Sequence, residues 1–313
     1  MPPNIGYLLP TREQIMEGRP DAASLLALAA RAEALGYDSV WVGEFGAGTA
    51  AARSSDAARR RGRPGSAGGA RHCGAVAGTA QSRAAGAPGG DAGSGLRGAL
   101  HPRRRHRPRL PNIRAEFAAC GVPFEQRVGR MMEGLRLCRA LWTGEAVDWD
   151  GRWPVKGGVL APVPHRPGGP PIWIGGNTPA SLERVGKWFD GWFPNAPDPA
   201  AFTEQWRHVQ TIAATVGRDG SSLSAAMYLT LTVDDDADRA AARMDAFLEG
   251  YYGAPAAVLR QRQAVYSGPA SGVASWLDGY ARAGATDLVL RFAGEPERHL
   301  EALAKVRASL GWH

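Results

Sequence analysis

The sequence predicts an α/β fold, and within that class an eight-unit (β/α) TIM barrel. Short apolar runs alternate with stretches whose apolar residues recur at helical spacing, the pattern of a parallel sheet covered by helices. Six such runs are visible, and residues 46–109 leave room for two more. A doubly wound open sheet is the structural alternative, but no G-x-G-x-x-G motif follows the first run. We expect one domain spanning residues 1–313.

The first two units are clear in the sequence. NIGYLL at residues 4–9 is a predicted strand that Pro10 ends. Asp21 is the predicted N-cap of a long helix that stops at Gly36, and residues 37–44 form the second strand.

The pattern resumes beyond residue 110. An amphipathic helix is predicted at residues 124–144, followed by a loop rich in Gly, Pro and Trp at 148–169. Thr178 stands at an N-cap position with Pro179 at the first helical position. Helices, two of them within 235–263, separate the later predicted strands. These strands cover residues 172–174, 191–194 and 224–233, and a last one ends at Arg291.

Residues 46–109 do not fit this pattern. They contain 13 arginines and no lysine against Asp56 and Asp91, so the net charge of +7 comes from this segment and the remaining chain is mildly acidic. The segment has three large aliphatic residues and no Phe, Tyr or Trp, too little apolar surface to offset its ordering entropy. We expect it to be disordered or misfolded. Its Arg-rich run lacks interleaved aromatic residues, which argues against a specific nucleic-acid interface.

Composition also limits the environment and the chemistry. No apolar run is long enough to span a membrane and no signal peptide is recognisable, so a cytoplasmic protein is expected. Cys73, Cys120 and Cys138 are predicted to be free thiols. The histidines have no metal-ligand spacing, and no metal site is predicted.

Several blocks of the sequence resemble the bacterial-luciferase-like family of flavin-dependent oxidoreductases, which are (β/α) barrels. The resemblance covers about residues 1–45 and 110–313, and its blocks are GYDSVWVGE, EFAACGVPFEQRVGRMMEGLRLCRALWTGE, PIWIGGNTPASLERVGKWFDGWFP and GATDLVLRF. It implies a monooxygenase that uses reduced FMN and O2 on a small organic substrate, with a separate flavin reductase as partner and a homodimer as a compatible assembly. A deazaflavin-dependent hydride-transfer enzyme is the alternative within the family.

The family's third and fourth strands have no counterpart in residues 46–109. RHCGAVAGTAQSR and LRGALHPRRRHRP can, however, be encoded by codons that give family-like sequences when read one nucleotide over. These are Gly-Thr-Ala-Val-Leu-Leu-Pro-Ala-Leu-Arg-Asn-Pro and Ser-Glu-Gly-Arg-Phe-Ile-Leu-Gly-Val-Gly-Ile-Gly. We hypothesise a compensated frameshift, with one nucleotide gained near Phe45 and one lost before Leu110. An inactive product of a frameshifted gene is therefore a further alternative.

Gly175, Gly176, Asn177 and Thr178 form the strongest candidate cofactor site, at a predicted strand-to-helix junction. Glycines let backbone N–H groups approach a phosphate, and a helix N-terminus favours an anion. The resemblance strengthens this interpretation over an ordinary tight turn with a threonine cap.

Other candidates are less specific. Arg291 ends the last strand and is a candidate anion contact near the phosphate, or a partner of Glu295 or Glu297. Glu44 ends the second strand and is a weak catalytic candidate, or a helix cap. Two further sets come from apolar and aromatic residues: Tyr7, Leu9, Trp142 and Trp188 are expected in the core, and Trp149 and Trp153 in a lid.

Overall fold

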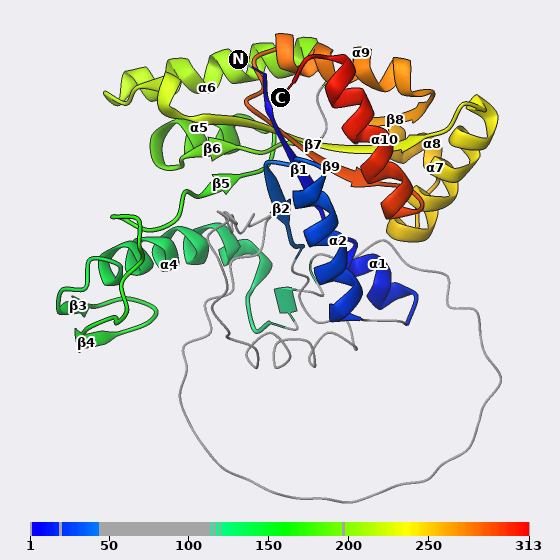
Figure 1. Cartoon of the computed structure of the whole chain (residues 1–313). Helices are drawn as coiled ribbons and strands as arrows, with labels where there is room; N and C mark the ends of the chain where they lie inside the picture. Colours follow the sequence, from blue (N-terminus) through cyan, green and yellow to red (C-terminus); the bar gives the residue numbers. More distant parts are fainter. Residues whose placement is uncertain are drawn as a thin grey trace, which may run out of the picture.

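The computed structural model describes residues 2–18, 21–43, 114, 117–118, 120–195 and 198–312, and a curled parallel sheet lies at its centre (Figure 1). Every strand pair in this sheet is parallel, as the sequence predicts. The strands are β1 (Asn4–Leu8), β2 (Ser39–Trp41), β5 (Trp173–Ile174), β6 (Gly191–Trp192), β7 (Ser224–Val233), β8 (Val265–Gly268) and β9 (Asp287–Phe292).

The strand order is that of an opened barrel. Neighbouring strands run β2-β1-β9-β7-β6-β5, and β8 pairs with the carboxyl half of β7. Within the described part of the chain the sheet ends at β2 and β5, the two strands that flank the expected third and fourth strands in sequence. Those two strands, and the segment 46–109, lie outside the described residues.

Helices cover the outer face of the sheet. They are α1 (Thr11–Met16), α2 (Ala22–Ala34), α4 (Arg127–Leu141), α5 (Pro179–Trp188), α6 (Pro199–Thr215), α7 (Ala237–Tyr252), α8 (Ala256–Arg260), α9 (Ala270–Arg282) and α10 (Pro296–Ser309), with short 3-10 turns at Phe124–Gln126 and Gly220–Ser222. Helices α2, α5, α6, α9 and α10 all contribute buried side chains to one apolar cluster with the strands.

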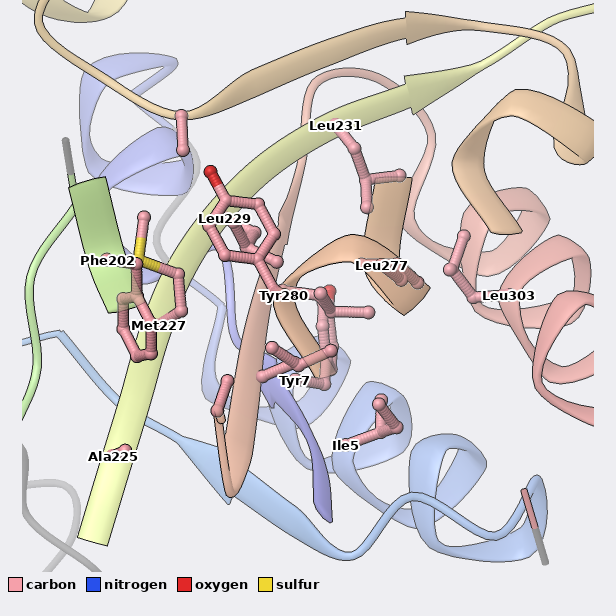
Figure 2. Packing of buried hydrophobic residues seen from close by; sticks show 14 of the residues in the cluster. Ile5, Tyr7, Phe202, Ala225, Met227, Leu229, Leu231, Leu277, Tyr280 and Leu303 are labelled. Carbon is pink, nitrogen blue, oxygen red and sulfur yellow. The ribbon is translucent and has the colours of Figure 1, made fainter. Parts of the chain in front are cut away.

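This cluster is the hydrophobic core, and Figure 2 shows part of it. Alternate residues of β7, including Met227, Leu229 and Leu231, point into it and are fully buried. Tyr7 also lies there, with its ring stacked on Phe292 at 5.1 Å between centroids. Burying a side chain of this size contributes about 1.5–3 kcal/mol, so the core dominates stability. Tyr7 and Leu9 are therefore core residues, as expected.

Local signals set the helix boundaries as predicted. The Asp21 carboxylate accepts hydrogen bonds from the backbone N–H of Ala23 and of Ser24, both at 3.0 Å, and so caps α2. Gly36 follows this helix with a φ of 82°, a conformation that glycine adopts at little cost.

Four short elements were not predicted. Residues 148–169 contain most of an antiparallel hairpin, β3 (Val147–Trp149) and β4 (Val155–Gly158), instead of only loop. Strand β8 and helix α1 were also missed. All are six residues or shorter, too short for a periodic pattern to show, and β8 depends on the long β7 as its partner.

Trp188 was wrongly expected in the core. It is the last residue of α5 and its side chain is 54% exposed, because it lies beyond the buried stripe of this helix. Trp142 is half-buried and its ring packs closely against Gly169.

Candidate functional site

The turn between β5 and α5 brings the four predicted cofactor residues together at the carboxyl edge of the sheet. Gly176 has a φ of 99°, and a Cβ there would lie 2.9 Å from the Ser181 hydroxyl oxygen. A Cβ on Gly175 would lie 3.0 Å from the carbonyl oxygen of Phe193. Both positions therefore need glycine, one for its backbone conformation and both for space. Residues 176–178 are exposed, so the turn is accessible to a ligand.

Thr178 is the N-cap of α5, and Pro179 follows at the first helical position, as predicted. The Thr178 hydroxyl oxygen accepts from the backbone N–H of Ser181 at 3.3 Å, and the two hydroxyl groups are 2.8 Å apart. A helix N-terminus has backbone N–H groups without intrahelical partners and a partial positive charge. The turn thus presents donors and two hydroxyl groups at one point.

Arg184 places a cation at this turn. The sequence analysis did not identify this residue. Its Nη2 donates to the Ser181 hydroxyl oxygen at 3.4 Å, and its Nε is buried without a hydrogen-bond partner in the described structure. The sequence does contain a signal for Arg184. It follows Ser181 by three residues, and this spacing places the two side chains on one face of a helix.

The inner face of the sheet, opposite the core, is lined by aromatic rings. Trp41 lies against Trp173 and Phe193 with centroid distances of 5.3 and 5.2 Å, and Phe193 contacts Tyr228 at 5.9 Å. These residues come from β2, β5, β7 and the end of β6, so strands far apart in sequence build one wall. An aromatic wall excludes water and offers flat apolar surface to a planar ligand.

Arg291 extends this inner face at the carboxyl end of β9. Leu288, Leu290 and Phe292 belong to the core, so the alternation of the strand directs Arg291 to the opposite side. It is only 2% exposed, and its Nε and Nη2 donate to the hydroxyl oxygen of Thr230 at 3.3 and 3.1 Å. No ion pair with Glu295 or Glu297 is found among the described contacts.

Arg291 is not next to the glycine turn. Strands β7 and β6 separate β9 from β5, which corresponds to about 14 Å along the sheet at normal strand spacing. The predicted contact between Arg291 and a phosphate at the turn therefore stays a prediction.

Glu13 of α1 is a partly buried acid that the sequence did not reveal. Burial raises the pKa of its carboxyl group. The Arg291 guanidinium acts in the other direction, but the pKa stays raised overall. Glu13 in turn contributes to the raised pKa of Tyr7 and of Tyr251. A carboxyl group with a raised pKa at the carboxyl end of barrel strands is a candidate for holding a proton. No local motif marks it, because Arg291 and Tyr251 lie more than 200 residues away in the sequence.

The remaining candidates are placed differently or fall outside the described chain. Glu44 and Cys73 lie outside the described residues, while Cys120 and Cys138 are free thiols. Trp149 and Trp153 lie in the β3–β4 hairpin, which packs on α4 apart from the main sheet (Figure 1), and their role as a lid over the substrate stays a prediction.

No group of three or more His, Cys, Asp or Glu side chains in the described part of the chain could hold a metal ion. No helix in that part of the chain is long and apolar enough to cross a membrane.

Known proteins resemble this chain in sequence and in fold. The family model described as luciferase-like monooxygenase matches residues 112–313, more than half of the chain. A 5,10-methylenetetrahydromethanopterin reductase of Methanolobus tindarius is 32% identical over 130 residues, 42% of this chain and 39% of the relative. An F420-dependent glucose-6-phosphate dehydrogenase of Mycobacterium leprae (strain Br4923) is 30% identical over 134 residues, with the same shares. The chain thus spans about two fifths of the length of the curated relatives it matches.

Among solved structures, an F420-dependent secondary alcohol dehydrogenase in complex with an F420-acetone adduct is similar over nearly the whole chain. The alignment covers 99% of each chain with a TM-score of 0.66 and 16% sequence identity. At this identity the likeness concerns the fold alone, and it confirms the predicted barrel class.

Proposed function

Because the chain belongs to the luciferase-like monooxygenase family, we propose that it is an oxidoreductase that uses the deazaflavin coenzyme F420 for hydride transfer. F420 appears in the names of one of the two curated relatives and of the solved structure reported above. The expected monooxygenase reaction with reduced FMN and O2 is supported by the family description and is the second candidate.

The observation that carries the proposal is the glycine turn before α5. Its two glycines leave a cradle that a Cβ would fill, and Thr178 and Ser181 place hydroxyl groups at its edge. Arg184 brings a cation with an unpartnered Nε to the same point. These residues fit the phosphate of either coenzyme, since phosphate needs convergent donors and positive charge.

The inner face would hold the ring system and the substrate. The bound coenzyme supplies the chemistry of accepting or donating a hydride. The chain supplies the phosphate grip, the aromatic wall of Trp41, Trp173 and Phe193 that excludes water, and a partly buried carboxyl group, Glu13, that can hold a proton. Supply of reduced coenzyme by a separate reductase and assembly as a homodimer stay predictions.

The coenzyme is tested by titrating the full chain with F420 and, separately, with FMN while following fluorescence. We expect F420 to bind more tightly. Thr178→Ala should weaken its binding, because the variant removes one hydroxyl donor and loosens the turn. Asp198→Ala is the matched control: Asp198 caps α6 by accepting from Ala201 at 2.8 Å, so it also loses an N-cap, at about 1 kcal/mol of stability, but should bind F420 normally. Equal losses in both variants, or tighter FMN binding, would contradict the proposal.

The inactive-product hypothesis needs its own test. A cooperative thermal transition of the full chain together with F420 retention through gel filtration would contradict it. The nucleotide sequence across codons 44–111 tests the frameshift itself, because codons incompatible with the shifted sequences would exclude it.

A further inference from the structure

Arg291 is a buried cation, and the Glu13 carboxyl group acts on it only through space. Its side chain is only 2% exposed, yet no carboxylate of the described residues forms an ion pair with it. Its Nη1 is buried and has no hydrogen-bond partner in the described structure. Burying an uncompensated charge costs free energy, so such a group is retained where another molecule completes it.

Four aromatic rings enclose the guanidinium. Its central carbon lies 4.4 Å from the ring centroid of Tyr251 and 4.8 Å from that of Phe247. The rings of Tyr228 and Tyr252 follow at 5.3 and 5.4 Å. Cation–π contact compensates part of the cost of burial, and the rings shield the cation from water, so any added anion is attracted strongly.

The guanidinium nitrogen without a hydrogen-bond partner determines what would bind. Thr230 occupies Nε and Nη2, which leaves the two N–H groups of Nη1 as free donors. Burial raises the pKa of Tyr251 to about 12 and that of Tyr228 well above its ordinary value, so both phenols stay neutral beside the guanidinium. The two donors of Nη1 suit a carboxylate, and the flat apolar rings around them suit an organic group attached to that carboxylate.

The position within the fold relates this anion site to the substrate. Arg291 lies on the inner face at the carboxyl end of β9, where substrates of (β/α) barrels bind. Two strands separate it from the glycine turn that would hold the coenzyme phosphate. We propose that Arg291 anchors a carboxylate of the substrate, an inference that rests on the proposed oxidoreductase function.

The experiment compares benzoate with benzamide, which has the same ring but no charge. Both are titrated calorimetrically into the full chain, with F420 saturating and without it. We expect benzoate to bind roughly tenfold to a hundredfold more tightly than benzamide, as a charge-assisted hydrogen bond implies. Arg291→Gln should abolish this preference, Arg291→Lys should retain part of it, and both should bind F420 as the wild type does.

Arg260→Gln is the matched control. Arg260 is also partly buried beside α7, but it pairs with Asp245 at 2.7 Å, so its loss should leave the preference for benzoate unchanged. The comparison of the two probes in the wild type decides the question even where Arg291→Gln fails to fold.

Equal binding of the two probes, or binding of neither, would overturn the proposal. So would a loss of F420 affinity in Arg291→Gln as large as that in Thr178→Ala, because Arg291 would then hold the coenzyme. If F420 does not bind while benzoate is still preferred, the proposed coenzyme is wrong and the carboxylate site stands.

Discussion

Asp234 and Arg291 are buried charges at the carboxyl ends of two neighbouring strands, β7 and β9, and their surroundings differ. Asp234 has three cationic neighbours: Arg239 donates to it with Nε at 2.8 Å, Arg243 lies at 3.3 Å and Arg298 at 3.6 Å. Arg291 has a neutral hydroxyl and aromatic rings. The chain therefore pairs one buried charge directly with opposite charges and gives the other only the more distant Glu13 carboxyl group. A structural role follows for Asp234, and a binding role for Arg291.

The largest effect is expected from Asp234→Asn. The variant leaves three guanidinium groups facing one another without an acid, so it should lose more stability at neutral pH than any other variant below. Denaturant unfolding measures this loss. Asp235→Asn is the matched control, because Asp235 is the exposed neighbour; an equal loss there would contradict the structural role of Asp234.

The same variant should change the acid dependence of stability. Hydrogen bonds from Arg239 hold the pKa of Asp234 well below its usual range. A lowered folded-state pKa stabilises the protein above the unfolded value of about 3.9, and this contribution is lost as the pH falls toward the folded value. The difference in stability between the wild type and Asp234→Asn should therefore begin to shrink only below about pH 4 and should keep shrinking as the pH falls further.

Thr230→Val is expected to have the next largest effect. It keeps the shape of the side chain but removes the hydroxyl that accepts both hydrogen bonds of Arg291. A buried charged group left without its acceptor costs about 1–3 kcal/mol, measured by denaturant unfolding. Thr232→Val removes a hydroxyl that pairs with His299 at 3.2 Å, a bond between neutral groups, and should cost less. The reverse order would mean that Arg291 has another acceptor.

Glu13→Gln should have a smaller effect that depends on pH. Burial raises the pKa of Glu13, so its stabilising contribution is complete below the unfolded value of about 4.3 and is lost as the pH rises through the folded value. The variant should match the wild type near pH 4 and be more stable at neutral pH. Parallel stability curves at all pH values would show that this carboxyl group titrates normally.

Arg291→Met is expected to have the smallest effect on the protein without ligands. Removing an uncompensated buried charge recovers its desolvation cost, while the lost cation–π contacts offset that gain, for a net change within about 1 kcal/mol. Thermal unfolding without ligand tests this. A loss as large as that of Asp234→Asn would make Arg291 structural and remove the contrast between the two charges.

Much of the fold could be predicted because its signals are local. The cap at Asp21, the stop at Gly36 and the cap at Thr178 each depend on hydrogen bonds or backbone angles within a few residues. The glycine turn was found for the same reason. Strand β8 was missed because its four residues become a strand only by pairing with β7.

The sequence by itself determined the alternating α/β pattern, the family resemblance and the turn before α5. Only the tertiary structure decided that Arg291 points to the inner face, away from the glycine turn, and that Glu13 lies near it. The physical reason is distance along the chain: α1, β7, α7 and β9 meet at Arg291 through packing, and a buried charge acquires its environment only when those elements come together.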